Sequence, residues 1–173
     1  MTERWLNPNR RIQLCELALA VIVAVAGVFF GWRTGPDSGP QAFGVLMIVG
    51  GAAVALWILV QMTRPRIGYR DGQLLVNLRM GGALTVPIQH VECFFLGQSS
   101  APLPGGAKWN SRVSTVVVRL SEAAGQWAQR DVLPVLGKWT DGYITIYGTS
   151  CEPLDVQRVN QLNRRLREVQ RSL

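Results

Sequence analysis

Two long apolar runs, residues 17–32 and 42–60, constrain the fold of this chain more than any other feature. A membrane-spanning helix needs about 20 mostly apolar residues to cross a hydrocarbon core of about 30 Å. Neither run contains a charged residue, and the short polar segment 33–41 separates them. Extending the first run back to residue 12 gives it enough length to span. We therefore predict a two-helix transmembrane hairpin over residues 12–62, with helices at 12–32 and 42–60.

Two other interpretations of the first run are open. An apolar helix is also found in the core of soluble proteins, although two such runs in tandem are less typical of one. The second alternative is a cleaved signal peptide, with Arg10 and Arg11 as its basic region and Ala24-Val25-Ala26 as the small residues of a cleavage site. Apolar sequence continues beyond that point, which leaves too short a hydrophobic core before the cut. This favours the transmembrane interpretation.

Positive charges lie mainly at the two ends of the hairpin rather than in its turn. The turn has only Arg33, accompanied by Asp37. Positively charged flanks are typical of the cytoplasmic side of a membrane. We therefore expect a multi-pass protein of the plasma (inner) membrane with both termini cytoplasmic and residues 1–11 as the N-terminal flank. The predicted juxtamembrane cations are Arg10, Arg11, Arg64 and Arg66.

Small residues in the apolar runs indicate where helices contact each other. Gly27 and Gly31 form a GxxxG motif, and Gly51 and Ala55 repeat its spacing. Small side chains at this spacing let helix backbones approach closely in lipid. Packing within the hairpin is favoured, and contact between two copies of the chain, a homo-oligomer, stays open. No ionisable residue lies deep in either run, which argues against a proton relay, a pore or a transport site.

Residues 67–173 have the pattern of one soluble domain made mostly of β-strands. Apolar and polar residues alternate in short segments that Gly-rich turns separate, which is typical of antiparallel strands. At the end, apolar residues recur from Val156 to Leu173 at spacings of three and four, which predicts an amphipathic helix. Ser150 or Glu152 is the expected N-cap. About seven strands are expected, at residues 67–70, 73–80, 83–89, 91–97, 112–120, 127–136 and 143–147.

Three segments carry a resemblance to a known family: residues 69–76 (YRDGQLLV), 86–91 (VPIQHV) and 143–147 (YITIY) before the last helix. With them, the order of elements resembles bacterial pleckstrin-homology-like (PH-like) domains on small membrane proteins with two N-terminal transmembrane helices. The resemblance implies a PH-like fold for residues 67–173 and a binding or scaffolding role. Relatives that bind phosphoinositides use a basic loop between the first two strands. Here that loop is Asp71-Gly72, without a basic cluster.

The sequence carries no catalytic or metal-binding motif. There is one histidine, His90, and no nucleophile elbow, zinc-protease helix, phosphate loop or dinucleotide fingerprint. Cys15, Cys93 and Cys151 are odd in number and form no CxxC motif, so we expect three reduced thiols and no metal or cofactor. The net charge of +7 suits anionic lipid. Scattered cations and the lack of a recognition motif argue against nucleic acid.

Two Lys-Trp pairs are the candidate contact residues. Lys108-Trp109 and Lys138-Trp139 lie in expected loops, and alternate loops of an up-and-down arrangement fall on one rim. An indole ring with an ammonium group suits lipid headgroups, so we predict contact with the membrane or a partner. In the alternative, both tryptophans fold back onto the domain. If 83–89 and 91–97 form a single strand, the rim faces the opposite way.

Together these features favour a non-enzymatic, membrane-anchored binding or scaffold module with a protein partner of unknown identity. The alternative is an accessory or assembly subunit of a larger membrane complex. An enzyme or a transporter is less favoured. The first two hypotheses differ in whether residues 67–173 alone bind what the full chain binds.

Overall fold

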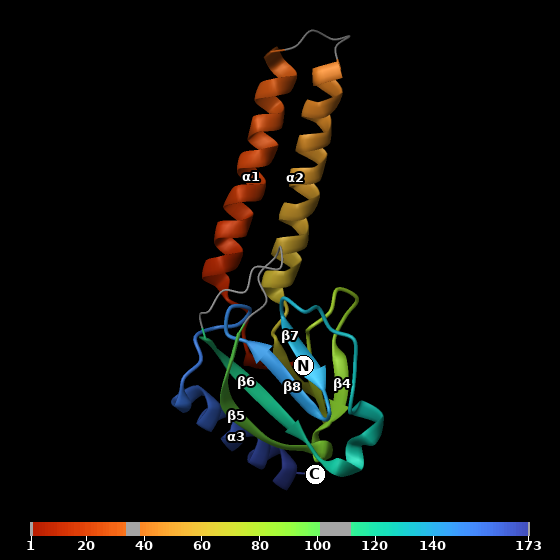
Figure 1. Cartoon of the computed structure of the whole chain (residues 1–173), viewed down its shortest axis with the longest axis vertical. Coiled ribbons are helices and arrows are strands. Elements are labelled where there is room, and N and C mark those ends of the chain that lie inside the picture. The colour runs from red at the N-terminus through yellow and green to blue at the C-terminus, as the bar shows by residue number, and fades with distance from the viewer. Residues whose placement is uncertain (1, 34–38, 101–111, 173) are drawn as a thin grey trace. The chain divides into compact units, whose positions relative to one another are not determined.

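The computed structural model describes residues 2–33, 39–100 and 112–172, and the chain forms two compact units (Figure 1). One unit, Arg10–Arg64, is a helical hairpin. The other combines Met1–Asn9 with Pro65–Leu173 and is here called the β domain. The β domain is therefore larger than the predicted 67–173, because it also contains the chain that precedes the hairpin.

The hairpin consists of α1 (Arg10–Arg33) and α2 (Gly39–Thr63). Both helices are long and apolar enough to cross a membrane. Large apolar side chains cover their surfaces, and Leu19 and Leu46 are 63% and 69% exposed. A helix that is apolar all round is typical of a membrane span or of a buried core helix, and these helices are not buried. Lipid is the solvent that fits their surface.

The two helices contact each other through glycines. A Cβ atom on Gly27 would lie 2.7 Å from the carbonyl oxygen of Gly44, and one on Gly51 would lie 2.9 Å from that of Ala20. A Cβ atom on Gly44 would also lie 3.0 Å from the nitrogen of Gly31. Such distances leave no room for a side chain, so glycine permits the close backbone approach. Three of the predicted small residues thus lie at the helix–helix contact.

The β domain contains two four-stranded antiparallel sheets, followed by one helix. The first sheet has the order β1 (Glu3–Leu6), β2 (Ile67–Arg70), β3 (Gln73–Val76) and β4 (Leu84–Pro87). The second has the order β5 (Val91–Ser100), β6 (Arg112–Leu120), β8 (Tyr143–Tyr147) and β7 (Gly137–Thr140). Two 3₁₀ helices, η1 (Ile88–His90) and η2 (Glu122–Trp127), and the final helix α3 (Val156–Arg171) complete it.

Two Asp-Gly turns join neighbouring strands. Asp71 and Gly72 have φ angles of 50° and 77° between β2 and β3, and Asp141 and Gly142 have 54° and 76° between β7 and β8. Positive φ at both central residues matches the twist of a tight hairpin, and Asp-Gly is a preferred pair there. The first turn was predicted from the sequence.

The prediction for residues 127–142 was wrong. Residues 128–136 contain no strand, and β7 occupies part of the predicted turn at 137–142. Pro134 has no N–H for a strand ladder, and the Leu133 N–H instead donates to the Leu78 carbonyl at 2.8 Å. β7 lies at the edge beside β8, so the second sheet is not a simple up-and-down meander. In contrast, β2, β6 and β8 have the predicted bounds.

β1 was not predicted, and it raises the number of strands to eight. β1 precedes the hairpin in the sequence and β2 follows it, and the two strands pair with Glu3 opposite Tyr69. Trp5 and Leu6 are 1% and 0% exposed, and the Trp5 ring stacks on Tyr69 with centroids 5.6 Å apart. The N-terminal segment, expected to be a flank, is thus part of the core.

The core lies between the sheets, and α3 packs against it. Asp155 caps α3 by accepting a hydrogen bond from the Arg158 N–H at 2.6 Å, so the predicted caps, Ser150 and Glu152, were wrong. An aspartate in this place satisfies an otherwise unpaired N–H. The fully buried members of the core include Leu6, Ile67, Leu74, Val76, Leu78, Val86, Ile88, Ile144, Ile146, Leu162 and Leu166.

Adjacent glycines in α2 test the hairpin packing. We expect Gly51→Val to lower the unfolding free energy of the hairpin by about 1–3 kcal/mol, because the new side chain overlaps Ala20 and Ala24. Gly50→Val is the matched control, since a Cβ atom there meets nothing within 4 Å. Reversible unfolding of the full chain in bicelles measures both. Equal effects at the two positions would show that the glycines do not form the contact.

Candidate functional site: the neck of the β domain

The chain leaves the β domain after Asn9 and returns to it at Pro65. The two segments are adjacent, because the Arg66 N–H donates to the Leu6 carbonyl at 2.7 Å. A third segment runs beside the first: Pro8 and Cys151 form an antiparallel bridge. We call residues 6–9, 65–67 and 150–152 together the neck. All three segments belong to the β domain.

Arg66 is the central residue of the neck. Its side chain is only 5% exposed, although arginine side chains are rarely buried. Its Nε donates to the Ser150 carbonyl at 2.9 Å, and one terminal nitrogen donates to the Asn77 carbonyl at 3.4 Å. A guanidinium has five donors and suits several carbonyls at once. Arg66 therefore joins the returning segment to two distant parts of the chain.

Asn77 holds the returning segment from the other side. Its side-chain amide donates to the Pro65 carbonyl at 2.6 Å, and its backbone N–H donates to the Arg66 carbonyl at 3.0 Å. Proline has no N–H, so its carbonyl is the only backbone hydrogen-bonding group that this residue offers. Asn77 therefore binds the carbonyl groups of two consecutive residues of the returning segment, Pro65 and Arg66.

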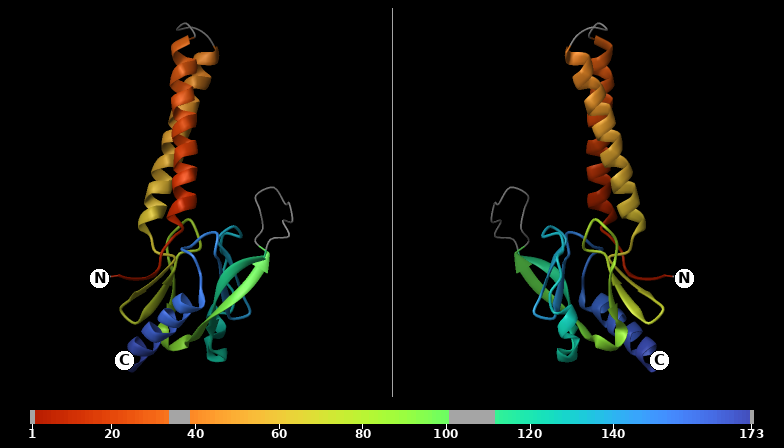
Figure 2. Two further views of the ribbon diagram at one scale, coloured as in Figure 1. Left: turned by 90° about the vertical axis from the view of Figure 1, so that its left-hand side faces the viewer. Right: turned by 90° about the vertical axis from the view of Figure 1, so that its right-hand side faces the viewer.

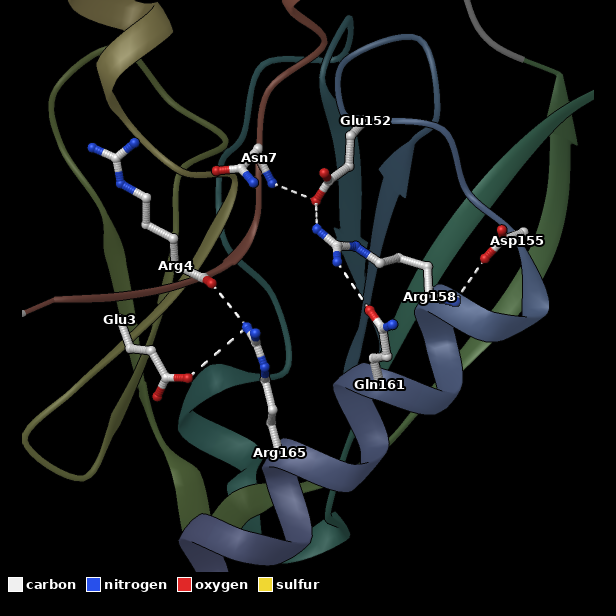
Figure 3. Close-up of polar contacts among 8 residues, drawn as sticks. All are labelled: Glu3, Arg4, Asn7, Glu152, Asp155, Arg158, Gln161 and Arg165. Atoms are coloured by element: carbon white, nitrogen blue, oxygen red, sulfur yellow. Dashed lines mark hydrogen bonds and ion pairs between the residues drawn. The ribbon is translucent and has the colours of Figure 1, made fainter.

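Glu152 connects the N-terminal segment to α3 (Figure 3). It accepts hydrogen bonds from the Asn7 N–H at 2.9 Å and from the guanidinium of Arg158. Arg158 also donates to the side-chain oxygen of Gln161 at 3.0 Å. The Glu152 N–H donates to the Asn7 carbonyl at 2.9 Å, so Asn7 is bound through both backbone groups. The first turns of α3 therefore hold the segment that precedes α1.

Arg165 extends this contact along β1. Its guanidinium donates to the Arg4 carbonyl at 2.9 Å and lies 3.9 Å from the carboxylate of Glu3 (Figure 3). Both side chains of the ion pair are partly exposed, so its contribution to stability is small. The hydrogen bond to the carbonyl matters more for the fold, because it occupies the free edge of β1.

Cys151 lies inside the neck and is fully buried. Burial raises the pKa of its thiol to about 12, and nearby Glu152 acts in the same direction, whereas Arg66 and Arg158 oppose the shift. Its Sγ is 3.5 Å from the Tyr147 carbonyl, as a weak donor. A buried thiol with a raised pKa is a poor nucleophile and metal ligand. Cys151 is therefore a packing residue.

No catalytic or metal-binding group emerges from the described residues. They contain no cluster of three or more His, Cys, Asp or Glu side chains that could hold a metal ion. The His90 ring packs on Trp127 with centroids 5.1 Å apart, and its Nδ1 is 3.4 Å from the Ser121 hydroxyl. Trp127 is neither an acid nor a nucleophile, and the Ser121 hydroxyl is not part of a chain of hydrogen bonds to an acidic side chain within the described residues. The arrangement holds chain segments together.

Of the two Lys-Trp pairs, the structure describes Lys138-Trp139, and it places both of these residues on a strand rather than on a loop. Trp139 is 2% exposed and donates from Nε1 to the Trp127 carbonyl at 2.7 Å, so it belongs to the core, as in the alternative in which the tryptophans fold back onto the domain. Lys138 is exposed on the edge strand β7 rather than on a loop. Lys108 and Trp109 lie outside the described residues.

The other predicted site residues separate into two groups. Arg10 and Arg11 are exposed at the start of α1, and Arg64 is half-buried just after α2, so these remain candidates for lipid headgroups. Arg66 is not one of them, because it is buried in the neck. Ala55 is half-buried on α2.

Sequence reasoning missed Arg66, Asn77 and Glu152 as a connected set. A cation after an apolar run has an ordinary topological explanation, which concealed the structural role of Arg66. Nothing local marks Asn77 or Glu152, since their partners lie 12 and 145 residues away. Asp155 could have been found, because it directly precedes the first residue of a helical apolar pattern.

Comparisons of the chain with protein-family models, with curated proteins and with solved structures found no match.

Replacing Arg66 tests its role in the neck. We expect Arg66→Met to lower the unfolding free energy of the β domain by about 3 kcal/mol, because buried carbonyls lose hydrogen bonds to a charged donor. Arg70→Met is the matched control, since Arg70 is exposed and its ion pair within the described residues is with its neighbour Asp71. Denaturant unfolding of the full chain, followed by tryptophan fluorescence, compares them. A similar small loss in both variants would contradict the role of Arg66.

Thiol labelling tests the environment of Cys151. A pKa raised from 9.0 to about 12 gives a thiolate fraction at pH 8 that is about a thousandfold smaller. We expect a variant that retains only Cys151 to react with a maleimide far more slowly than one that retains only the half-buried Cys93. In denaturant the two rates should converge. Fast labelling of native Cys151 would show that the neck opens.

Proposed function

We propose that this protein is a membrane-anchored, non-catalytic binding module, in which a PH-like β domain is presented at the cytoplasmic face of a plasma (inner) membrane. The observation that carries the proposal is the insertion of an apolar hairpin between β1 and β2, two neighbouring strands of one sheet. The anchor is therefore an insertion within the β domain, connected to it at both of its ends.

The surfaces of the two units support this division of roles. On the hairpin, large apolar side chains such as Val25 and Leu56 are 62% and 65% exposed, which suits lipid. In the β domain most of the large apolar side chains gather in one core. Both ends of the hairpin join the same β domain, so a spanning hairpin leaves both of its flanks on one side of the membrane. The cations Arg10, Arg11 and Arg64 favour the cytoplasmic side.

The order of elements supports a PH-like architecture. Strands packed in two antiparallel sheets precede a single C-terminal helix that packs on their core. The strand β1 and the edge position of β7 are additions to the expected pattern. The β2–β3 turn, Asp71-Gly72, has no basic cluster, so we propose a protein partner rather than an inositol lipid.

A variant without the hairpin tests this function. Replacing residues 10–64 by a short Gly-Ser linker keeps β1, and the 2.7 Å bond between Arg66 and Leu6 shows that the linked ends are close. We expect the full chain to resist alkaline extraction from membranes and the linker variant to be soluble, folded and able to bind the same partner. Residues 67–173 alone should aggregate, because they lack the buried Trp5 and Leu6.

Two results would contradict the proposal. Release of the full chain by alkaline carbonate would exclude an integral anchor. In the second case, the linker variant folds but does not bind the partner that cross-links to the full chain. The hairpin would then be the recognition element, and the protein would be an accessory subunit of a larger membrane complex.

A further inference from the structure

No linker separates the neck from the hairpin in the sequence. The Asn9 N–H donates to the Ser150 carbonyl at 3.3 Å, and α1 begins at the next residue, Arg10. On the returning side, α2 ends at Thr63, two residues before Pro65, whose carbonyl is bonded within the neck. A hairpin that spans a membrane therefore leaves the neck within a few residues of the membrane surface.

The first of two turns beside the neck comprises residues 79–82, between β3 and β4. Asn77 precedes this turn and binds the Pro65 carbonyl with its side-chain amide at 2.6 Å. Met80 follows Asn77 by three residues, which span at most about 10 Å of extended chain. Its side chain is 61% exposed. An uncovered methionine therefore lies close to the neck.

The second turn directly precedes β7 and is joined both to the first turn and to the neck. At its start, the Leu133 N–H donates at 2.8 Å to the carbonyl of Leu78, which directly precedes the first turn. At its end, the Leu136 carbonyl accepts from the Ser150 hydroxyl at 3.1 Å. Val135 lies between these two contacts and is 53% exposed. Figure 1 and both views of Figure 2 show the two turns, near the starts of β4 and β7, at the same end of the β domain.

The exposure of these two side chains is unusual within the β domain. Among its described residues, three large apolar side chains have more than half of their surface exposed, namely Met80, Val135 and Val156. Two of the three belong to the turns beside the neck. Because the turns are joined, these two side chains share one end of the domain rather than being scattered over its surface.

Exposed cations accompany these side chains. Arg79 directly precedes Met80, and Lys138 follows Val135 by three residues. Neither cation forms an ion pair within the described residues, and the Nε of Arg79 binds a carbonyl of its own turn. The described acid nearest to them in sequence is the exposed Asp131, four residues before Val135. We call the four residues Arg79, Met80, Val135 and Lys138 the neck face.

The opposite end of the β domain has a different charge. β7 runs from the second turn to the Asp141-Gly142 turn, where the Gly142 N–H donates to the Ala128 carbonyl at 2.9 Å, just after η2. β2 likewise begins in the neck and ends at Arg70, which pairs with the exposed Asp71. Asp141 is exposed as well. Anionic lipid would be repelled by these acids, whereas it would attract the unpaired cations of the neck face.

We propose that the neck face rests in the headgroup layer of an anionic membrane. Met80 and Val135 enter the layer, and Arg79 and Lys138 contact lipid phosphates. Buried apolar area and attraction to anionic lipid are the two terms that hold a protein surface at this interface. The inference deepens the proposed function and rests on it, because the spanning hairpin is what keeps the neck at the membrane. It adds that side chains of the β domain itself hold the domain in one orientation.

Fluorescence of the full chain in nanodiscs tests the inference, with an equimolar mixture of phosphatidylcholine and phosphatidylglycerol as the lipid. An environment-sensitive NBD label is attached through Gly81→Cys in the first turn or, as the matched control, through Gly125→Cys in η2. A Cβ atom at either glycine meets nothing within 4 Å. Cys15 and Cys93 are replaced by serine, and the buried Cys151 is retained.

We expect the label at position 81 to lie in lipid and the label at position 125 to lie in water. Lipid with a nitroxide on an acyl carbon near the headgroup should quench the first label about threefold more than the second. Acrylamide, a neutral quencher in water, should show the reverse order. In nanodiscs of phosphatidylcholine alone the difference should shrink, because each cation near an anionic surface changes the docked-to-undocked ratio roughly fivefold.

Substitutions in and next to the second turn show whether both turns dock together. Val135→Asp combined with Lys138→Gln leaves the first turn and its label unchanged. It should lower the docked-to-undocked ratio roughly fivefold or more, and with it the quenching by lipid. Gln126→Asp combined with Arg130→Gln lowers the net charge equally in and after η2 and should not affect the quenching. Thermal unfolding of each variant verifies its fold.

Three outcomes would overturn the inference. They are equal quenching of the two labels by lipid, unchanged quenching in the folded second-turn variant, and a blue-shifted label at position 81 that lipid does not quench, which would identify a second copy of the chain as the occupant. The proposed function fails separately, through alkaline extraction or through a linker variant that does not bind the partner. Integral anchoring and partner binding with equally quenched labels would leave the proposed function intact and remove only the lipid contact of the neck face.

Discussion

The hydrogen bond from the Arg66 N–H to the Leu6 carbonyl closes the β domain across the whole helical hairpin. β1 and β2 are neighbours in one sheet, yet the hairpin lies between them in sequence. The entropic cost of closing a loop rises only slowly with the length of the loop, so a long insertion is tolerated. Two packed antiparallel helices lower this cost, because they bring their own ends together. The hairpin thus favours the pairing of β1 with β2.

Closing the domain in this way requires polar groups to be buried, and the neck provides hydrogen-bond partners for several of them, although Arg158 Nε is buried without a partner among the described residues. Burial of a charged guanidinium is unfavourable unless its donors are bonded. Arg66 meets this condition with the carbonyls of Ser150 and Asn77. Glu152 likewise binds both Asn7 and Arg158. The neck is therefore specific, because a shift of any one segment would leave buried polar atoms unpaired.

The sequence predicted those elements whose signal is local. The apolar runs indicated α1 and α2, the Asp71-Gly72 turn indicated the β2–β3 hairpin, and the helical period indicated α3. β1 escaped detection because its few residues contain no full apolar alternation. The position of Arg66 was not predictable, and for Trp139 the sequence left burial and surface exposure both open, since both residue types also suit a membrane surface. Their burial depends on partners that only the folded chain brings near, namely Ser150 for Arg66 and Trp127 for Trp139.

α3 relates the neck to the β5 edge. Arg158 and Arg165 on one side of the helix bind the N-terminal segment and β1, and Asn163 and Gln170 on another side bind β5. The 3.6-residue period separates these two sides, so both sets of contacts form at once. Since one helix makes both, the first half of β5 is held in a fixed position relative to the neck. The neck in turn contains the two segments through which the β domain joins its hairpin.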